Sequence, residues 1–576
     1  MNAFTSSTLL PHPKTLLSPN SPSFSSVNPK TSSYITSPQA FTKSSSSKQH
    51  NKPPRKPLLK PSFPAVILNA CDNFIDTFID PPFHPSVGPK YTLSDNFAPV
   101  DELPPTECEV VKGSLPSCLD GVYIRNGPNP QYLPRGPLHF FDGDGMLHST
   151  RISQGKAIFC SRYVKTYKYL IEKEAGLSII PNLFSNFNSR ISSVTRGAVS
   201  IARTKFGQFD PSNGIGLANT SLALFGGNLF ALCESDLPYG IKLAPNGDII
   251  TIGRHDFDGN LSMNMTAHPK IDPNTGEAFA FRYGPISPFL TYFRIDPNGT
   301  KSRDVPIFSM TNPSFVHDFA ITKNYAIFPD IQIEMNPCAL ITRGSPVGYN
   351  SKKVPRLGVI PRYARDESEM KWFEVPGFNM IHAINAWEED DGDTIVVIAP
   401  NTISVDHFME RLDLIHASIE KVKIDLKTRM VRRYPVSTRN LDLASINPAY
   451  VGKKNKYMYA AIGNPSPKAK GVVKLDLSIS DIDHRDCIVA TRIFGPDCFS
   501  SEPFFVAKDP NNGFAADEDD GYVVCYMHNE STRESSFLVM DAKSQNLEIV
   551  AVVKLPRRVP YGFHGIFVKE SDLNTI

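Results

Sequence analysis

The first 71 residues of this 576-residue chain contain no aspartate and no glutamate, although they carry eight lysines and arginines. Fourteen of the first fifty residues are serine, and prolines interrupt the most apolar stretch, which argues against a secretory signal. A serine-rich, basic and acid-poor leader is typical of a transit peptide, and lysine in place of arginine favours a plastid. We therefore predict that residues 1–55 are a plastid transit peptide and disordered linker. A disordered tail without a targeting role is the alternative.

Several other features are missing from the chain. It has no run of eighteen apolar residues, so we expect no membrane-spanning helix. Its nine cysteines are scattered, odd in number and never spaced as CxxC, which argues against a disulfide framework and a cysteine zinc site. There is no P-loop, no GxGxxG after a strand and no Ser-His-Asp set. Because the whole chain has 60 basic and 58 acidic residues, the part beyond the leader is mildly acidic, and we expect no nucleic-acid partner.

Short β-rich runs alternate with polar turns over most of the chain. In the recurring unit an apolar strand ends at an aspartate, and a polar turn and a second strand follow. A sheet of this length must split or close on itself, so we predict an all-β fold. Residues 406–421 are the main exception and suggest either a helix or an extended loop. The aspartates of the recurring unit are Asp272, Asp296, Asp425, Asp476 and Asp541.

Two further segments have a helical apolar pattern. Within residues 56–94, apolar residues recur at helical spacing from Phe63 to Phe78, which predicts an amphipathic helical extension. The segment 175–207 has four basic residues, no acidic ones and a group of apolar side chains near its start. Such a composition suits a surface that dips into lipid headgroups. Packing of both helices on the body of the protein is the alternative.

Four histidines lie in short apolar runs beside a small residue, a proline or an aspartate, as at a strand end that enters a tight turn. Spread over half the chain, they can meet only in a closed, repetitive fold. Together they offer four neutral imidazoles, which suit iron, copper, zinc or nickel equally well. These residues are His268, His317, His382 and His564. The other ten histidines, including His139 and His148 beside the FDGDGM turn, are assigned to the core or the surface.

Eight short motifs resemble the carotenoid cleavage dioxygenases, in the order of that family, from about residue 95 to the last few residues. Together with the leader, residues 86–102 and 440–460 are most similar to the plastid-targeted fourth plant clade. The eight motifs are RNGPNPQY (125–132), HFFDGDGMLH (139–148), ESDLPYG (234–240), TAHPK, FVHDFAIT, FNMIHAINAWEE (378–389), SEPFFV (501–506) and GFHGIFV.

The resemblance implies a seven-bladed β-propeller at residues 95–576, with a dome of loops and short helices over the metal face. It implies one Fe(II) per subunit, held by the four histidines, with dioxygen as co-substrate and no catalytic residue beyond the ligands. Carboxylates hold three of the rings in this family, and the matching residues here are Glu234, Asp442 and Glu502. The family usually has glutamate where this chain has Asp442, and aspartate is shorter by about 1.5 Å. We expect that contact to be longer, bridged by water or made by a shifted backbone.

The activity implied is oxidative cleavage of a C=C bond of a carotenoid or apocarotenoid, at the 9,10 (9′,10′) position, giving two carbonyl products. Cleavage at 7,8 (7′,8′) and a carotenoid-binding protein without catalysis are the alternatives. A retinyl-ester isomerohydrolase and a β-propeller scaffold are more distant ones. The leader and the resemblance predict a location in a chloroplast or chromoplast, on plastoglobules or thylakoids, and imply no protein partner.

Overall fold

The computed structural model describes residues 62–80, 82, 87–181, 184, 189–336, 347–409, 411–463, 466–482, 486–509 and 517–573. Internal contacts divide the chain into two units, Met1–Pro57 and Leu58–Ile576. The predicted transit peptide, residues 1–55, lies outside the described residues, and so do several residues of the segment 175–207. Within the described part, no helix is long and apolar enough to cross a membrane.

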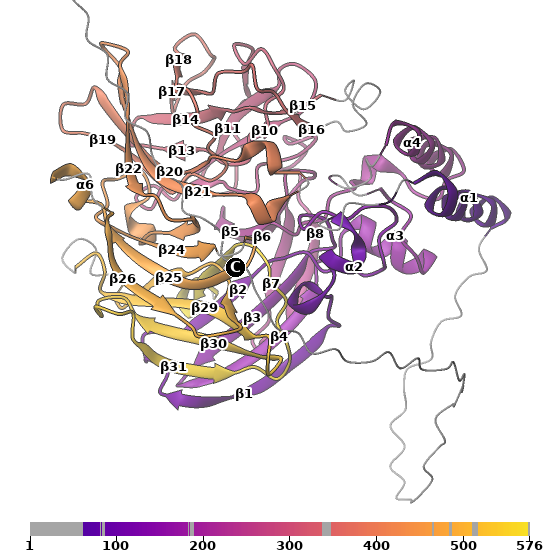
Figure 1. Cartoon of the computed structure of the whole chain (residues 1–576), viewed down its shortest axis with the longest axis horizontal. Helices are drawn as coiled ribbons and strands as arrows, with labels where there is room; N and C mark the ends of the chain where they lie inside the picture. Colours follow the sequence, from indigo (N-terminus) through magenta and orange to yellow (C-terminus); the bar gives the residue numbers. More distant parts are fainter. Residues whose placement is uncertain are drawn as a thin grey trace, which may run out of the picture. The chain divides into compact units, whose positions relative to one another are not determined.

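The described chain is mostly β-structure, as predicted (Figure 1). Four antiparallel sheets each contain four strands, and in three of them every strand pairs with the next strand of the chain. A fifth sheet has only two strands, β15 (Ile333–Met335) and β16 (Val347–Tyr349). The four-stranded sheets are β5 (Ser221–Phe225), β6 (Asn228–Leu232), β7 (Tyr239–Leu243) and β8 (Ile249–Arg254); β9 (Lys270–Ile271), β10 (Ala278–Tyr283), β11 (Leu290–Ile295) and β12 (Val305–Ile307); β13 (Ala320–Ile321), β14 (Tyr325–Asp330), β17 (Arg356–Pro361) and β18 (Lys371–Glu374); and β19 (Asn385–Glu388), β20 (Thr394–Thr402), β21 (Ala417–Asp425) and β22 (Val431–Ser437).

A larger sheet of 14 strands joins the two ends of the described chain. β1 (Leu103–Gly113) pairs with β31 (Ile549–Lys554), and Figure 1 shows these two strands side by side. β2 (Gly121–Arg125) pairs with β32 (Gly565–Lys569). Strands from both ends of the sequence therefore hold one another. The other members are β3 (Met146–Ser153), β4 (Lys156–Tyr163), β23 (Leu441–Ser445), β24 (Tyr457–Gly463), β25 (Ala469–Asp476), β26 (Ile488–Ile493), β27 (Cys498–Ser500), β28 (Phe504–Ala507), β29 (Gly521–Asn529) and β30 (Glu534–Asp541).

The strand pleat divides the buried side chains between neighbouring cores, because successive residues of a strand point to opposite faces. In β14, Phe328 packs into a cluster shared with β10 and β11, and Ile327 packs into a cluster shared with β20 and β21. Phe319 and Phe328 stack with ring centroids 5.2 Å apart, and Phe281 meets both rings edge-on. Each such strand therefore stabilises two adjacent sheet interfaces at once.

The recurring aspartates form the turns that the sequence predicts. Asp296 Oδ1 accepts the backbone N–H of Asn298 at 2.9 Å, and Asp425 Oδ1 accepts that of Lys427 at 2.9 Å. The other three aspartates of the recurring unit make the same bond to the residue two positions later. This side-chain bond takes the place of a backbone turn bond and reverses the chain after each strand.

The helices α1 to α4 gather beside one part of the strands (Figure 1). α1 (Phe63–Phe74) continues as the π-helical turn η1 (Ile75–Ile79), and α4 (Arg190–Lys205) packs against both. The Ser189 hydroxyl accepts the N–H of Ser192 and so begins α4. Shorter helical pieces are α2 (Pro89–Thr92), η3 (Asp95–Phe97), α3 (Tyr167–Ala175), η4 (Pro211–Asn213), η5 (Val405–His407), η6 (Leu412–Leu414), η7 (Pro448–Tyr450), α6 (Ile479–Ile482) and α7 (Glu570–Leu573).

Of the two interpretations of residues 406–421, the helix is wrong. Among the described residues of this range, helical structure is limited to the short turns η5 and η6, and β21 begins at Ala417. Strand pairing decides this, because β21 bonds to β20 along one edge and to β22 along the other. Val422 and Ile424, the apolar residues that follow, continue the strand into a buried core.

Candidate metal centre

Each of the four predicted histidines lies just before an edge strand of its sheet. His268 precedes β9, His317 precedes β13, His382 precedes β19 and His564 immediately precedes β32. The prediction that each histidine lies where a strand ends and a turn begins is therefore wrong, because each histidine lies where a strand is about to begin. Equivalent places in different sheets bring residues far apart in the sequence to one point.

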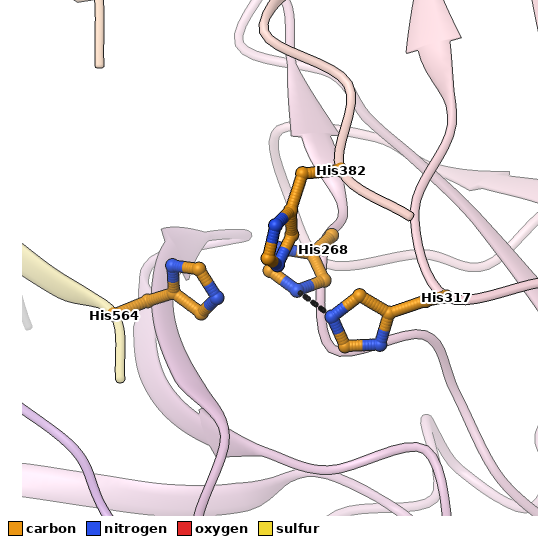
Figure 2. A group of neighbouring side chains, drawn as sticks. All are labelled: His268, His317, His382 and His564. Carbon is orange, nitrogen blue, oxygen red and sulfur yellow. Dashed lines mark hydrogen bonds between the residues drawn. The ribbon is translucent and has the colours of Figure 1, made fainter. Parts of the chain in front are cut away.

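The four imidazoles face a common centre (Figure 2). One ring nitrogen from each residue lies within 4.8 Å of the others. His268 Nε2 and His317 Nε2 are 3.0 Å apart. A metal–imidazole bond is about 2.1 Å long, so ligands at right angles on one ion lie about 3.0 Å apart and opposite ones about 4.2 Å apart. The donor set and its spacing therefore fit a single metal ion.

Three of the rings contact carboxylates through the nitrogen that faces away from the cluster. His382 Nδ1 lies 2.9 Å from Asp442 Oδ1, and His564 Nδ1 lies 2.8 Å from Glu502 Oε1. His317 Nδ1 contacts Glu234 in the same way. An N–H donated to a carboxylate fixes the ring and leaves Nε2 with a lone pair for a metal. The three carboxylates predicted from the sequence are thus the three that contact the histidines.

Asp442 makes its contact directly, and a shifted backbone accompanies it. The pairing of β23 with β24 slips between Asp442 and Ser445, and Leu443 adopts a left-handed conformation with φ of 50°. Leu443 N–H donates to Asp442 Oδ1 at 2.8 Å. The contact is therefore direct and has an ordinary hydrogen-bond length, while a shift of the backbone relative to glutamate-containing relatives stays a prediction.

The buried surroundings change the protonation of this group. Burial lowers the pKa of His268 well below its ordinary value, and the other three histidines lower it further. Burial would also lower the pKa of His382, but Asp442 favours the protonated ring and raises it overall. Burial opposes ionisation of Asp442, yet His382 brings the pKa of that carboxyl below its ordinary value. Asp442 therefore favours positive charge at His382, whether it comes from a proton or from a metal ion on Nε2.

A buried aspartate ties three histidine segments together. Asp318 Oδ1 lies 2.8 Å from Lys270 Nζ, and Asp318 Oδ2 accepts the backbone N–H of Ala383 at 2.7 Å. Lys270 and Ala383 follow His268 and His382 by two residues and one residue, and Asp318 itself follows His317. Sequence analysis missed this role, although the aspartate in FVHDF was a visible signal.

A cavity of about 210 Å³ opens beside the histidines. His317, His382 and His564 line it, and most of the remaining wall is apolar. The ring of Phe315 stacks on that of His317 at 5.8 Å, with an angle of 6° between the planes. An apolar substrate would therefore lie against the histidine cluster. The aromatic residues of the wall are Phe97, Phe140, Phe141, Phe184, Phe315, Phe408, Tyr561 and Phe563.

The sequence of this chain is similar to those of a known protein family. A family model described as retinal pigment epithelial membrane protein matches residues 97–569. The chain belongs to this family. A family relative from Arabidopsis thaliana, named probable carotenoid cleavage dioxygenase 4, chloroplastic, is 65% identical over 526 residues, covering 90% of this chain and 88% of the relative.

Other members support the same assignment. A relative from Oryza sativa subsp. japonica, named 9-cis-epoxycarotenoid dioxygenase NCED1, chloroplastic, is 57% identical over 524 residues, covering 89% of this chain and 81% of the relative. The crystal structure of cobalt-substituted Synechocystis ACO matches with a TM-score of 0.66 and 26% identity, over 81% of this chain and 96% of that one. The resemblance to carotenoid cleavage dioxygenases is therefore confirmed.

Two histidines outside the cluster lie in the core, as expected from the sequence. His139 Nδ1 accepts the N–H of Phe141 at 3.2 Å, and its Nε2 lies 3.2 Å from the carbonyl oxygen of Phe408. His148 is fully enclosed within β3. Because Phe141 and Phe408 line the cavity, His139 supports the wall without belonging to the family's histidine cluster.

Proposed function

We propose that this protein is a non-haem Fe(II) dioxygenase that cleaves a C=C bond of a carotenoid or apocarotenoid. The observation that carries the proposal is an apolar, aromatic cavity that opens onto three imidazoles of a four-histidine cluster, with no carboxylate in that cluster. Iron bound there would supply the activation of dioxygen, which adds to one alkene and leaves two carbonyl products. The proposed ligands are His268, His317, His382 and His564, one iron per subunit.

The chain's own residues would do the remaining work. Glu234, Asp442 and Glu502 would orient three rings and keep their metal-facing nitrogens unprotonated. The aromatic wall excludes water and holds the polyene by apolar contact. Since the cavity is about 210 Å³, smaller than a usual ligand pocket, a short stretch of a long polyene fits within it. The depth to which the polyene enters the cavity would determine which of its bonds is cleaved.

The position of cleavage that we propose is 9,10 (9′,10′), which the resemblance to the fourth plant clade favours. The Arabidopsis relative carries that clade's name, while the rice relative is named for 9-cis-epoxycarotenoids. Cleavage at 7,8 (7′,8′) is the alternative with the same chemistry. A carotenoid-binding protein without catalysis is the alternative of a different class, and the three carboxylate-held rings disfavour it.

A seven-bladed propeller is the architecture that we propose for the described strands. Seven buried clusters join groups of strands in cyclic order, which supports this count. The last cluster returns to the first group, as radial closure requires. The successive groups are β5–β8, β9–β12, β13–β18, β19–β22, β23–β26, β27–β31 and β2–β4 with β32.

The location that we propose is the plastid, at the surface of thylakoids or plastoglobules. The acid-free leader supports import, and the two relatives reported above are named chloroplastic. α1 and α4 support the membrane contact through apolar side chains that face outward. The most exposed of these are Phe63, Val66, Phe74, Ile191, Val194 and Ile201.

One experiment tests the reaction and its position together. Purified, iron-loaded protein is incubated with β-carotene, zeaxanthin and 9-cis-epoxycarotenoids, and the products are identified by mass spectrometry. Products of 9,10 cleavage with uptake of labelled dioxygen into both carbonyls support the proposal. Uptake of carotenoid without oxygen consumption by iron-loaded protein would instead support the binding protein.

A further inference from the structure

One part of the cavity wall is polar and partly exposed to solvent. Lys468, which directly precedes β25, and Tyr561 both line the cavity. The side chain of Lys468 is 20% exposed, and that of its partner Glu530 is 22% exposed. Neither Lys468 nor Tyr561 contacts a histidine of the cluster in any described interaction. This polar group therefore lies apart from the proposed metal ligands.

The hydrogen bonds of the group leave capacity for a ligand. Lys468 Nζ donates to both carboxylate oxygens of Glu530, at 2.7 and 2.9 Å. An ammonium has three N–H donors, and the third has no hydrogen-bond acceptor among the residues that the structure describes. Asp95 Oδ2 lies 3.9 Å from Nζ, too far for a hydrogen bond. One donor of Lys468 is thus available to a molecule in the cavity.

Tyr561 complements this donor with an acceptor. Its hydroxyl donates to Glu530 Oε1 at 2.9 Å, and the side chain of Asn96 also hydrogen-bonds it, which leaves one lone pair of the phenol oxygen. Burial raises the pKa of Tyr561, and the bond to Glu530 raises it further, so the phenol stays neutral. An oxygen atom of a ligand can accept from Lys468, and a hydroxyl can also donate to Tyr561.

Aromatic rings surround these two polar atoms. The ring of Phe97 lies 4.9 Å from that of Tyr561 and 4.6 Å from that of Phe140. Lys468 Nζ lies 5.1 Å from the ring centroid of Phe499. A ligand that fits here combines a hydrocarbon body with one oxygen function, as the end of an oxygenated carotenoid does.

We propose that Lys468 and Tyr561 recognise an oxygen function at the end of the substrate, an inference that rests on the proposed carotenoid cleavage. A ring hydroxyl or a terminal carbonyl accepts the free N–H of Lys468. A plain hydrocarbon end removes water from this cation and offers no acceptor in return. The enzyme then prefers a hydroxylated carotenoid to its hydrocarbon counterpart.

The test compares zeaxanthin with β-carotene, which differ only in their two ring hydroxyls. In Lys468→Met, the ratio of kcat/KM for zeaxanthin to that for β-carotene is expected to fall about 10- to 100-fold, as for loss of a hydrogen bond to a charged donor. Tyr561→Phe lowers the ratio less. An apocarotenal distinguishes a terminal carbonyl from a ring hydroxyl. Its carbonyl oxygen accepts the N–H of Lys468, but it has no proton to donate to Tyr561. Lys554→Met, which breaks an exposed ion pair with Glu534, is the matched control.

Several results overturn this inference. An unchanged ratio in Lys468→Met would do so, whether kcat/KM stays the same for both substrates or falls equally for both. An equal fall would indicate a structural role only. Binding of the two carotenoids to the protein, monitored through their absorption spectra, tests the same preference without catalytic turnover. Loss of zeaxanthin preference in binding supports the polar site even if no cleavage occurs, and in that case only the proposed function fails.

Discussion

Asp442 Oδ1 lies 2.9 Å from His382 Nδ1, although an aspartate reaches about 1.5 Å less far than the glutamate usual at this position. The slipped pairing of β23 with β24 and the left-handed backbone of Leu443 accompany the contact. The ring of His382 thus keeps a direct carboxylate partner beside an irregular stretch of main chain.

The first prediction concerns this carboxylate. Asp442→Asn keeps the size but removes the charge, and iron affinity or activity is expected to fall about 10- to 100-fold, as for other partners of metal-bound histidines. Asp442→Glu is also expected to be less active than the natural protein, because the longer side chain pushes His382 from its place. Iron titration and oxygen uptake measure both effects. Full activity of Asp442→Glu would show that the backbone shift is not matched to aspartate.

The second prediction concerns the last histidine. His564→Ala removes one of four imidazoles whose nitrogens lie within 4.8 Å of one another, so the protein is expected to lose its bound iron. Metal analysis of the purified variant measures this. His416→Ala is the control, because that ring bonds to the carbonyl oxygen of Thr438 away from the cluster. Full iron occupancy in His564→Ala would end the assignment of this ligand.

The third prediction concerns Asp318. Asp318→Asn leaves Lys270 without its carboxylate partner and loosens the segments that carry three histidines. Breaking a buried ion pair costs about 3–5 kcal/mol, so a lower melting temperature is expected together with weaker iron binding. Asp296→Asn, in an exposed turn, is the control. An unchanged affinity for iron in a destabilised Asp318→Asn would limit this residue to a role in folding.

The sequence carries some of this architecture in local signals and leaves the rest to distant contacts. Asp425 bonds to a backbone N–H only two residues away, so its turn can be predicted from neighbouring residues. The four histidines are recognised because each lies in a short, distinctive motif. Lys468 and Glu530 are 62 residues apart, and no local pattern indicates that pair. Residues 406–421 have an apolar spacing that suits a helix, but pairing of β21 with two neighbouring strands overrides it.

The fourth prediction is a dependence of stability on pH. Burial lowers the pKa of His139 to about 4, against about 6.5 in the unfolded chain. The unfolded state therefore takes up the proton first, and stability falls as the pH drops from about 6.5 to about 4, by up to about 3 kcal/mol. Melting temperatures of the natural protein and of His139→Gln across this range measure the effect. An equal acid sensitivity in both proteins would assign it to other groups.

The fifth prediction concerns the outward faces of α1 and α4. The sequence predicts that the basic residues of 175–207 lie beside lipid headgroups. Two of them, Arg196 and Arg203, are instead buried and pair with Asp80, which follows η1, and with Asp72 of α1. These ion pairs hold the two helices together and leave an apolar outer surface. The double substitution Val194→Glu and Ile201→Glu, at positions 54% and 61% exposed, is therefore expected to reduce pelleting with liposomes while iron binding is kept.

Ile286→Glu is the matched control for this substitution, because Ile286 is 79% exposed in the hairpin between β10 and β11 and belongs to neither helix. Apolar contact with lipid scales with the area buried, so the double variant should lose binding in neutral and anionic vesicles alike. Loss confined to anionic vesicles would instead indicate attraction through Arg190 and Lys205, the exposed basic residues of α4. Equal pelleting of the double variant, the control and the natural protein would remove α4 from the membrane contact.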